Sequence, residues 1–293
     1  MTIREALNEG IRQLSRPCPG ALIQTPGLDA SLFMACTLAV RREELIIREN
    51  EQINENDRIK FANLIKRRIN GECTAYILGK KEFYGLEFTV NPAVLVPRPE
   101  TETLVESAIE ICKSLQKEIT SEISVLDLCT GSGAAAIVLK HEIPEIRVSA
   151  SDISAEALAV ACENSIKLLG KGEGRDDPVN FIKSDLFENI NSRFHLIVSN
   201  PPYVKSGDIG KLAPEVRQEP LFALNGGKDG LAIIRRIIGE SPDHLYQGGY
   251  LLMEADPRQM NEIKTLMETN GFRECRIIKD LSGNARVLKG IHY

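Results

Sequence analysis

The sequence predicts an α/β protein with a mostly parallel β-sheet, helices on both faces of the sheet, and a small helical domain in front of it. Three observations predict this fold. From about residue 120 onward, short apolar strands alternate with helical segments. The first 70 residues instead carry apolar side chains at helical spacing. Between these parts, residues 76–96 are rich in aromatic and β-branched residues punctuated by glycine, which is typical of a β-hairpin.

The helical part is expected to contain helices at residues 3–14, 28–39 and 56–69. The third ends at Asn70-Gly71, a pair that favours a helix C-cap. Pro97-Arg98-Pro99 ends the hairpin, and Thr101 is expected to cap a helix that runs to about residue 116. We therefore expect a helical docking domain at 1–74, a hairpin linker at 75–96 and a sheet domain at 97–293.

From about residue 120, the sheet domain is expected to alternate between strands and helices. The expected strands are 124–128, 147–151, 179–183, 194–199 and 249–253, followed by a terminal hairpin of 273–278 and 285–291. The expected helices are 134–141, 154–169, 229–238 and 257–270, with Ser154 and Asp229 as caps of the second and third. In such sheets, ligands bind beyond the carboxyl ends of the strands at the topological switch point. The motifs that carry the chemistry fall at these strand ends.

Composition and charge are those of an ordinary globular protein, with 43% hydrophobic and 26% charged residues. No stretch approaches the roughly 20 apolar residues of a membrane span, and the first residues lack the apolar block of a signal peptide, so we expect a cytoplasmic protein. The net charge of −5 argues against extensive nucleic-acid binding. Residues 1–95 carry 13 Lys/Arg against 12 Asp/Glu, and the remainder carries 23 against 29, so the acidic excess lies in the sheet domain.

The cysteines predict neither a disulfide framework nor a metal site. Their number is odd and no C-x-x-C pair occurs among positions 18, 36, 73, 112, 129, 162 and 275. The four histidines show no ligand spacing either. We expect reduced, mostly buried thiols and no bound metal.

A glycine-containing turn at the end of the first sheet strand is the first candidate binding motif. It comprises residues 127–133 (DLCTGSG), with Gly131 and Gly133 directly before a helix whose free N–H groups favour negative ligands. Asp152 ends the next strand 21 residues after Gly131, where a carboxylate can accept hydrogen bonds from ribose hydroxyls. The spacing is not the G-x-G-x-x-G of dinucleotide enzymes, which favours a single-nucleoside ligand. A tight turn without any ligand explains the glycines alone equally well.

This turn resembles the acid-x-Gly-x-Gly loop of class I S-adenosylmethionine methyltransferases. The resemblance implies a Rossmann-like sheet, with the loop passing beneath the cofactor and Asp152 holding its ribose. Asp185 and Leu186, which follow the third strand, would lie beside the adenine, although Asp185 also fits a simple turn or helix cap. The cofactor-binding residues implied in this way are Asp127, Cys129, Thr130, Gly131, Ser132, Gly133, Asp152, Asp185, Leu186 and Asn200. Cys129 replaces the usual first glycine, and a positive φ there would cost about 1 kcal/mol.

The second motif, Asn200-Pro201-Pro202-Tyr203, directly follows the apolar strand at 194–199. Proline lacks an N–H, so the carbonyl groups of this turn can face a ligand. The Asn200 side-chain oxygen adds an acceptor and Tyr203 adds a flat face, so the tetrad suits a planar –NH2 group with two donors. We expect these four residues to orient an amide or amino nitrogen for methyl transfer through proximity and fixed electrostatics, without a covalent intermediate. The competing interpretation is a rigid turn at a strand end.

Over its whole length the chain resembles the protein-(glutamine-N5) methyltransferases of the HemK/PrmC type. The matching segments are 75–79 (AYILG), 82–86 (EFYGL), 96–102 (VPRPETE), 197–203, 219–220 (EP), 226–231 (GGKDGL) and 286–287 (RV). The resemblance implies that the substrate is the glutamine of a Gly-Gly-Gln loop on a peptide chain release factor, gripped by the N-terminal domain. S-adenosylhomocysteine would be the product, the PRPETE loop would wall the pocket, and no membrane, nucleic acid or oligomer would be required. The sequence 253–256 (MEAD) departs from the family pattern but keeps Glu254, and we interpret the change as packing at the sheet edge.

Three alternatives remain. A DNA adenine-N6 methyltransferase also uses an N-P-P-Y-like tetrad, on a flipped base, but it needs the basic cleft that this acidic sheet domain lacks. A ribosomal-protein glutamine methyltransferase shares most of the motifs and is harder to separate by sequence. A non-catalytic binding module is argued against by the intact Asp152 and the complete tetrad.

Overall fold

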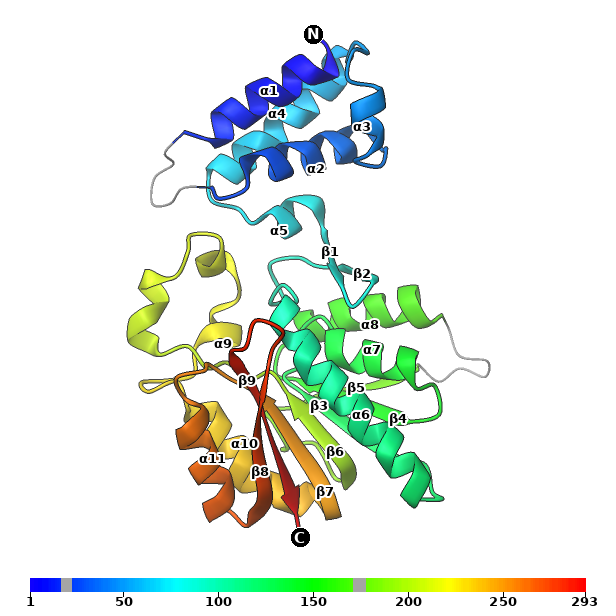
Figure 1. Cartoon of the computed structure of the whole chain (residues 1–293), viewed down its shortest axis with the longest axis vertical. Helices are drawn as coiled ribbons and strands as arrows, with labels where there is room; N and C mark the ends of the chain where they lie inside the picture. The colour runs from blue at the N-terminus through cyan, green and yellow to red at the C-terminus, as the bar shows by residue number, and fades with distance from the viewer. Residues whose placement is uncertain (17–22, 171–177) are drawn as a thin grey trace. The chain divides into compact units, whose positions relative to one another are not determined.

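The computed structural model describes residues 1–16, 23–170 and 178–293, so Cys18 lies outside the described residues. The chain divides into two compact units (Figure 1). One unit comprises Met1–Gly79 with Lys211–Gln218, and the other comprises Lys80–Gly210 with Glu219–Tyr293.

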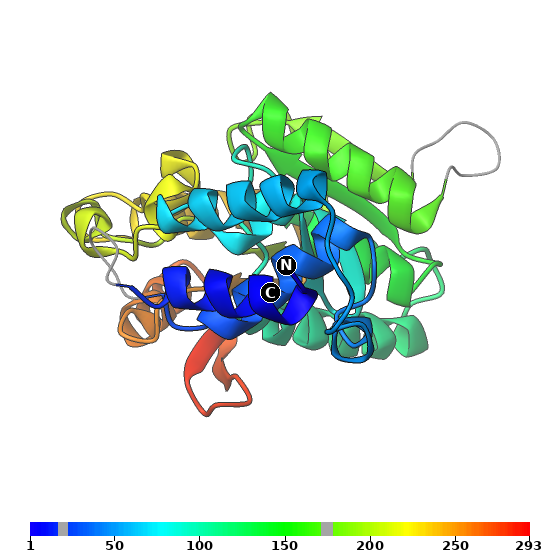
Figure 2. The same ribbon diagram turned by 90° about the horizontal axis from the view of Figure 1, so that it is seen from above.

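The first unit is helical. Its helices are α1 (Ile3–Leu14), α2 (Pro26–Leu38), α3 (Glu44–Ile47), α4 (Glu55–Ile69) and α5 (Thr74–Leu78). The three longer ones pack on one another around fully buried Phe33 and Met34 of α2 and Ile65 of α4 (Figures 1 and 2). These are the three helices predicted from apolar spacing. Gly71, at φ +90°, follows the C-cap of α4 as expected.

The prediction that residues 76–79 begin a hairpin is wrong. They belong to α5 and its C-cap Gly79, and the Cys73 sulfur accepts a hydrogen bond from the Tyr76 N–H at 3.4 Å. This local cap favours a helical turn over the strand that the aromatic and β-branched composition suggested.

The hairpin itself is shorter than predicted and belongs to the second unit. Strands β1 (Lys80–Phe83) and β2 (Leu86–Thr89) pair in antiparallel fashion across Tyr84 and Gly85, both at positive φ. The following residues, 90–96, form no strand. Buried Asn164 of α8 (Ala155–Leu169) accepts a hydrogen bond from the Thr89 N–H at 2.7 Å and donates one to the Thr89 carbonyl at 3.0 Å. The hairpin is therefore fastened to the sheet domain by side-chain hydrogen bonds.

The second unit contains a seven-stranded sheet in the order β5-β4-β3-β6-β7-β9-β8. The strands are β3 (Ser124–Leu128), β4 (Arg147–Asp152), β5 (Val179–Lys183), β6 (Phe194–Ser199), β7 (Leu245–Glu254), β8 (Phe272–Lys279) and β9 (Ala285–His292). Only β9 runs antiparallel to its neighbours, which confirms a mostly parallel sheet. The strand order reverses between β3 and β6, so their carboxyl ends form the switch point.

Helices cover both faces of this sheet (Figure 1). One core cluster lies beneath α6 (Glu102–Glu118) and α7 (Ala134–Glu142), with α8 beside α7, and a second lies beneath α10 (Ala232–Glu240) and α11 (Met260–Thr269). The short elements are η1 (Pro99–Thr101), η2 (Ser206–Lys211), η3 (Val216–Gln218), α9 (Leu221–Leu224) and η4 (Ser241–His244).

Two predicted helix starts and one edge assignment are wrong. Asp229 does not cap α10, because its carboxylate accepts from the Leu231 N–H at 3.1 Å and pairs with Arg235 at 2.7 Å, and the helix begins at Ala232. Helix α11 begins at Met260, three residues after the expected start. The segment at 253–256 does not pack at the sheet edge, because β7 lies between β6 and β9 and Glu254 is 1% exposed.

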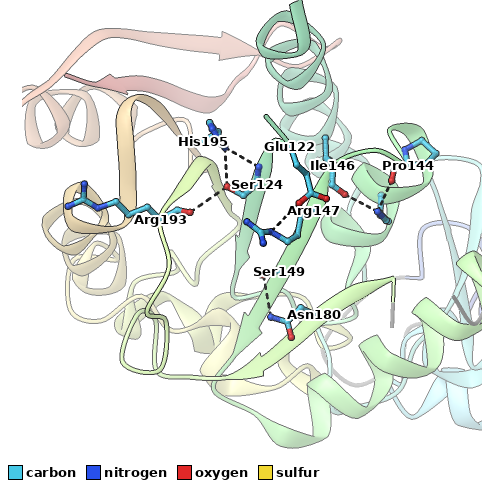
Figure 3. A network of polar contacts seen from close by, with 10 residues as sticks. Glu122, Ser124, Pro144, Ile146, Arg147, Ser149, Asn180, Arg193 and His195 are labelled. Atoms are coloured by element: carbon cyan, nitrogen blue, oxygen red, sulfur yellow. Dashed lines mark hydrogen bonds and ion pairs between the residues drawn. The ribbon is translucent and has the colours of Figure 1, made fainter. Parts of the chain in front are cut away.

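Polar side chains gather at the amino-terminal ends of the strands, on the side of the sheet away from the switch point (Figure 3). The Ser124 N–H at the start of β3 donates to His195 Nδ1 at 3.0 Å, and Arg147 at the start of β4 lies 3.7 Å from Glu122. Polar groups at the starts of β3 and β4 thus have partners within the protein. The chemistry-bearing motifs lie at the other end of the sheet.

Candidate active site

The carboxyl ends of the central strands surround a cavity of about 550 Å³. That size lies within the roughly 300–1,000 Å³ common for small-molecule sites. Its wall includes Ala93, Val94, Leu95, Cys129, Gly131, Ser151, Asp152, Ile153, Ser184, Asp185, Leu186, Asn200, Pro202, Leu221 and Phe222. A smaller cavity of about 50 Å³ shares Cys129, Gly131 and Asn200 with it and is bounded further by Pro97, Arg98, Thr101 and Asp127. The two sequence motifs, whose first residues are 73 positions apart, thus meet at one place.

Asp127, the last but one residue of β3, holds the glycine turn together. Its Oδ2 accepts hydrogen bonds from the Thr130 hydroxyl at 2.6 Å and from the Ala136 N–H at 3.2 Å, in the first turn of α7. Burial raises the pKa of Asp127 to about 7 against the opposing effect of these two bonds, and the nearby charge of Asp152 adds to the rise. A carboxylate at a helix N-terminus is favoured by the helix dipole. Asp127 therefore orders the loop and borders only the smaller cavity.

Asp152, the last residue of β4, lines the large cavity and links the glycine turn to the start of α8. Its Oδ2 accepts from the Gly131 N–H at 2.9 Å and its Oδ1 from the Ser154 N–H at 3.0 Å. Burial raises its pKa, and the backbone hydrogen bonds oppose that rise. Each carboxylate oxygen has a further lone pair, so Asp152 can still accept from a hydroxyl in the cavity.

Cys129, at the position of the family's usual first glycine, occupies the left-handed region with φ 59°. Left-handed backbone costs a residue with a Cβ about 1–2 kcal/mol. Burial raises the pKa of the Cys129 thiol, so the side chain is a neutral, apolar part of the wall of both cavities.

The two glycines of the turn have different reasons to be glycine. Gly131, at φ +56°, lines both cavities, and a Cβ there would meet nothing within 4 Å. Gly133, at φ +81°, lines neither cavity, and a Cβ there would approach Ile137 to 2.9 Å and Ala161 to 3.1 Å. Gly131 can thus face a ligand, whereas Gly133 allows α7 and α8 to pack closely.

The other predicted cofactor residues separate into cavity-lining and supporting ones. Asp185 and Leu186 line the large cavity, although the Asp185 carboxylate is also paired with Arg236 at 2.9 Å. Thr130 and Ser132 border the smaller cavity. The Ser132 carbonyl accepts a hydrogen bond at 3.0 Å from Asn164, the residue that also holds the hairpin.

Within the tetrad, Asn200 and Pro202 line the large cavity, Pro201 is buried, and Tyr203 is half-buried. The Asn200 Nδ2 donates to the Thr101 hydroxyl at 3.1 Å. The prediction that the Thr101 side chain caps α6 is wrong, because Thr101 is the last residue of η1 and already has the αR conformation (φ −67°, ψ −18°). The Tyr203 ring packs against the core cluster beneath α10 and α11, and its hydroxyl lies 3.4 Å from Glu254 Oε1. Burial and the charge of Glu254 raise the pKa of Tyr203, so the phenol stays protonated.

The glycine-rich segment 226–231 supports the tetrad backbone from behind. A Cβ on Gly226 would come within 2.6 Å of the Gly230 carbonyl and 2.7 Å of the Pro202 carbonyl. A Cβ on Gly230 would come within 2.4 Å of the Tyr203 carbonyl, which accepts from Gln259 Nε2 at 3.2 Å. Glycine is needed here for close approach of backbone to backbone.

Several family motifs are partners of one another. Arg98 of the PRPETE segment pairs at 2.6 Å with Glu219, whose side chain is 1% exposed. Glu100 of the same segment lies 3.7 Å from Arg286, which also pairs with Asp280 at 3.0 Å. Segments more than 100 residues apart in sequence thus brace the same wall, and Pro97, Arg98 and Thr101 line the smaller cavity as expected.

Sequence reasoning missed several residues at the cavity. Ile153, Leu221 and Phe222 line it while remaining 55%, 59% and 48% exposed. Ile153 could have been found from its position directly after Asp152. Asn164 carries no local signal, because a single Asn inside an apolar helix reveals neither its burial nor its distant partners.

Comparisons with known proteins define the class first. Solved structures that share the fold include the catalytic domain of hMettl16 in complex with an RNA hairpin, with a TM-score of 0.55 at 13% identity over 84% of each chain. Another is the Thermus thermophilus 16S rRNA N2 G1207 methyltransferase, with a TM-score of 0.51 at 18% identity over 73% of this chain and 50% of that one. At these identities the likeness concerns the fold, which is that of a methyltransferase. Residues 108–217 match the methyltransferase small domain, and residues 5–79 match the PrmC N-terminal domain.

Curated relatives narrow the class to a family. The release factor glutamine methyltransferase of Coxiella burnetii is 37% identical over 289 residues, 98% of either chain. Those of Rhodopirellula baltica and Neisseria gonorrhoeae are each 38% identical, over 90% and 92% of this chain and 89% and 94% of their own lengths. The chain belongs to the family of release factor glutamine methyltransferases. It is an S-adenosylmethionine-dependent protein methyltransferase.

The residues at the large cavity fit this cofactor. Asp152 is a buried acceptor with unused lone pairs, Gly131 has the conformation and the space for close approach, and Ile153 and Leu186 add apolar surface for a base. Among the described residues, no helix is long and apolar enough to cross a membrane.

Proposed function

We propose that the chain transfers a methyl group from S-adenosylmethionine to the side-chain amide nitrogen, N5, of the glutamine in the Gly-Gly-Gln loop of a peptide chain release factor. The observation that carries the proposal is the single cavity shared by Asp152 and by Asn200 and Pro202. One side of this cavity suits a nucleoside and the other suits an –NH2 group. The names of relatives 37–38% identical over nearly the full chain support glutamine as the target.

The roles of the chain's own groups follow from their positions. The bound cofactor would supply an electrophilic methyl group on a sulfonium. Asp152 would accept the ribose hydroxyls, with Gly131 beneath the cofactor and with Asp185 and Leu186 at its base. Asp127, Thr130, Ser132 and Gly133 would keep the loop in shape.

The tetrad would act on the target amide. An amide nitrogen is a weak nucleophile because its lone pair is delocalised into the carbonyl. The Asn200 Oδ1 and a proline carbonyl would accept its two hydrogens, and the Tyr203 ring would supply the flat surface beside them. Acceptors held in place would stabilise the positive charge that develops on the –NH2 group, and the enclosed wall would fix its direction of approach. The excess proton would leave to water after transfer.

We further propose that residues 1–74 recognise the release factor, that the segment at 75–96, which contains the β1–β2 hairpin, connects this domain to the catalytic part at 97–293, and that the reaction takes place in the cytoplasm. Membrane, nucleic acid and a second copy of the chain have no part in this proposal.

The test is methyl transfer from labelled S-adenosylmethionine to purified release factor, the same factor with its Gly-Gly-Gln glutamine replaced by alanine, ribosomal proteins and DNA. We expect label only on the intact factor, located on the glutamine by mass spectrometry. Labelling of DNA alone, of ribosomal proteins alone, or of the alanine variant would refute the proposal.

Asn200→Ala is the matching enzyme variant, with Asn261→Ala on the exposed face of α11 as its control. Asn200→Ala should remove turnover and leave cofactor affinity, measured by calorimetry, within a few-fold of the wild type. Loss of cofactor binding in a folded Asn200→Ala protein would show that its role is misplaced.

A further inference from the structure

Glu254, at the carboxyl end of β7, is a buried acid that contacts Tyr203 directly and lies next to Thr101, the hydrogen-bond partner of Asn200. It is 1% exposed, and its Oε2 has no hydrogen-bond partner among the described residues. Its Oε1 lies 3.4 Å from the Tyr203 hydroxyl, and the Thr101 hydroxyl acts on the same carboxyl group as a hydrogen-bond donor that lowers its pKa. Thr101 in turn accepts from Asn200 Nδ2 at 3.1 Å. A buried, incompletely paired carboxylate is costly, so its place beside the tetrad calls for a reason.

When Glu254 is ionised, the hydrogen bonds that link Asn200 to Thr101 and Thr101 to Glu254 can run in one direction only. A carboxylate only accepts, and a threonine hydroxyl has one proton to donate. When the Thr101 hydroxyl donates its hydrogen bond to Glu254, it can only accept a hydrogen bond from Asn200. The amide nitrogen of Asn200 must then face Thr101, and its oxygen Oδ1 must face the other way.

We propose that Glu254 is a positioning residue that, through Thr101, holds the Asn200 side-chain amide with its oxygen toward the cavity as an acceptor for the target –NH2 group. This inference rests on the proposed function for its consequence in catalysis, but the orientation of Asn200 can be tested without any substrate. The hydrogen bond from the Tyr203 hydroxyl also links this carboxylate to the last residue of the tetrad.

Protonation of Glu254 would remove this preference. A carboxylic acid can donate to Thr101, which frees the Thr101 proton for Asn200 Oδ1, and the Asn200 amide can then turn over. The NH2 group of Asn200 would face the –NH2 group of the target, donor against donor. The orientation thus depends on the charge of Glu254.

The groups around Glu254 place this change in an accessible pH range. Burial raises the pKa of Glu254 to about 7, and the negative charge of Glu100 on η1 adds to the rise. Hydrogen bonds from Thr101 and Tyr203 and the charge of Arg286 on β9 lower it. Arg286 itself is shared with Glu100 and Asp280.

The experiment compares the wild type with Glu254→Gln, Thr101→Val and Thr101→Ser. Each variant is checked for folding by circular dichroism and for cofactor affinity by calorimetry. Single-turnover methyl transfer should fall roughly 10- to 100-fold in Glu254→Gln and Thr101→Val, as expected when a reacting group is misplaced. Thr101→Ser keeps the hydroxyl and should retain most of the rate. Cofactor affinity should stay within about twofold of the wild type in all three, and a larger change would overturn the assignment of these residues to the target amide.

The pH profile and a spectroscopic signal show whether Glu254 orients the Asn200 side-chain amide or only supports the structure around it. The wild-type transfer rate should rise through about pH 7, and this limb should be missing in Glu254→Gln. The ¹⁵N signal of the Asn200 side-chain amide should titrate over the same range in the wild type and stay constant in Glu254→Gln.

Two results would overturn the inference: equal rates for Thr101→Val and Thr101→Ser, or an Asn200 amide signal whose pH dependence is unchanged in Glu254→Gln. If instead the wild type failed to methylate glutamine while the Asn200 signal behaved as expected, the proposed function would fail and the orientation by Glu254 would stand.

Discussion

Cys129 sits at φ 59°, a conformation that penalises any side chain, and this predicts an unusual order of stability among its replacements. Cys129→Ala and Cys129→Gly both remove the sulfur, and they differ only in the Cβ. At an ordinary position alanine is the more stable choice by roughly 0.4–1 kcal/mol, because glycine has more freedom to lose on folding. At Cys129 the Cβ costs about 1–2 kcal/mol in left-handed backbone.

The difference of these two effects leaves Cys129→Gly more stable than Cys129→Ala by roughly 0.5–1 kcal/mol, which corresponds to a shift of about 1–4 °C in Tm for a domain of this size. Cys36, exposed in the helix α2, provides the matched control. There Cys36→Ala should be the more stable by roughly 1 kcal/mol, because glycine is a poor helix former.

Thermal unfolding of the four variants, followed by circular dichroism, measures both differences. The reasoning predicts opposite signs at the two positions. If Cys129→Ala were as stable as Cys129→Gly or more so, the left-handed strain assigned to residue 129 would be refuted.

Three further outcomes are expected. Gly226→Ala, whose Cβ would come within 2.6 Å of backbone, should cost roughly 1–3 kcal/mol in thermal unfolding and most of the methyl-transfer rate, whereas Gly207→Ala, with open space around its Cβ, should change neither. Asn164→Ala should cost about 1–3 kcal/mol and speed hydrogen exchange at the Thr89 N–H; unchanged exchange would contradict the fastening of the hairpin. Burial and the charge of Arg147 lower the pKa of His195, so the unfolded chain binds more protons there and the free energy of unfolding should fall as the pH drops below about 6.5. His195→Gln should flatten this part of the stability profile; an unchanged slope would refute the assignment.

The alternating sheet domain was predictable because its strands are short apolar runs separated by helix signals. The bounds of β3, β5 and β6 match the expected ranges. The bounds of the hairpin were harder to predict, because composition does not show where a local cap overrides strand propensity. Cys73 is such a cap, at the start of α5. Asp229 failed as a cap for a related reason, since its pairing with Arg235 lies outside what a capping rule considers.

The site was predictable where a residue acts through its position at a strand end. Asp152, Gly131 and Asn200 all line the large cavity. What escaped prediction depends on contacts between distant segments. Examples are the interaction of Glu254 with Thr101, and Asn164, which joins the hairpin to the glycine turn. A buried acid in a strand has the same local sequence signal whether it supports a catalytic group or merely fills space.

The backbone contact between the tetrad and the segment at 226–231 has a consequence for how the protein tolerates change. Val204 exchanges backbone hydrogen bonds with Leu224 at 2.9 Å and Gly226 at 2.8 Å, and Gly226 and Gly230 bring no side chains between the two segments. The position of the tetrad backbone beside the cavity is therefore set by main-chain contacts, whereas the orientation of the Asn200 side chain depends on Thr101. Insertion or deletion of one residue at 224–226 would break this pairing and displace the backbone that supports the tetrad.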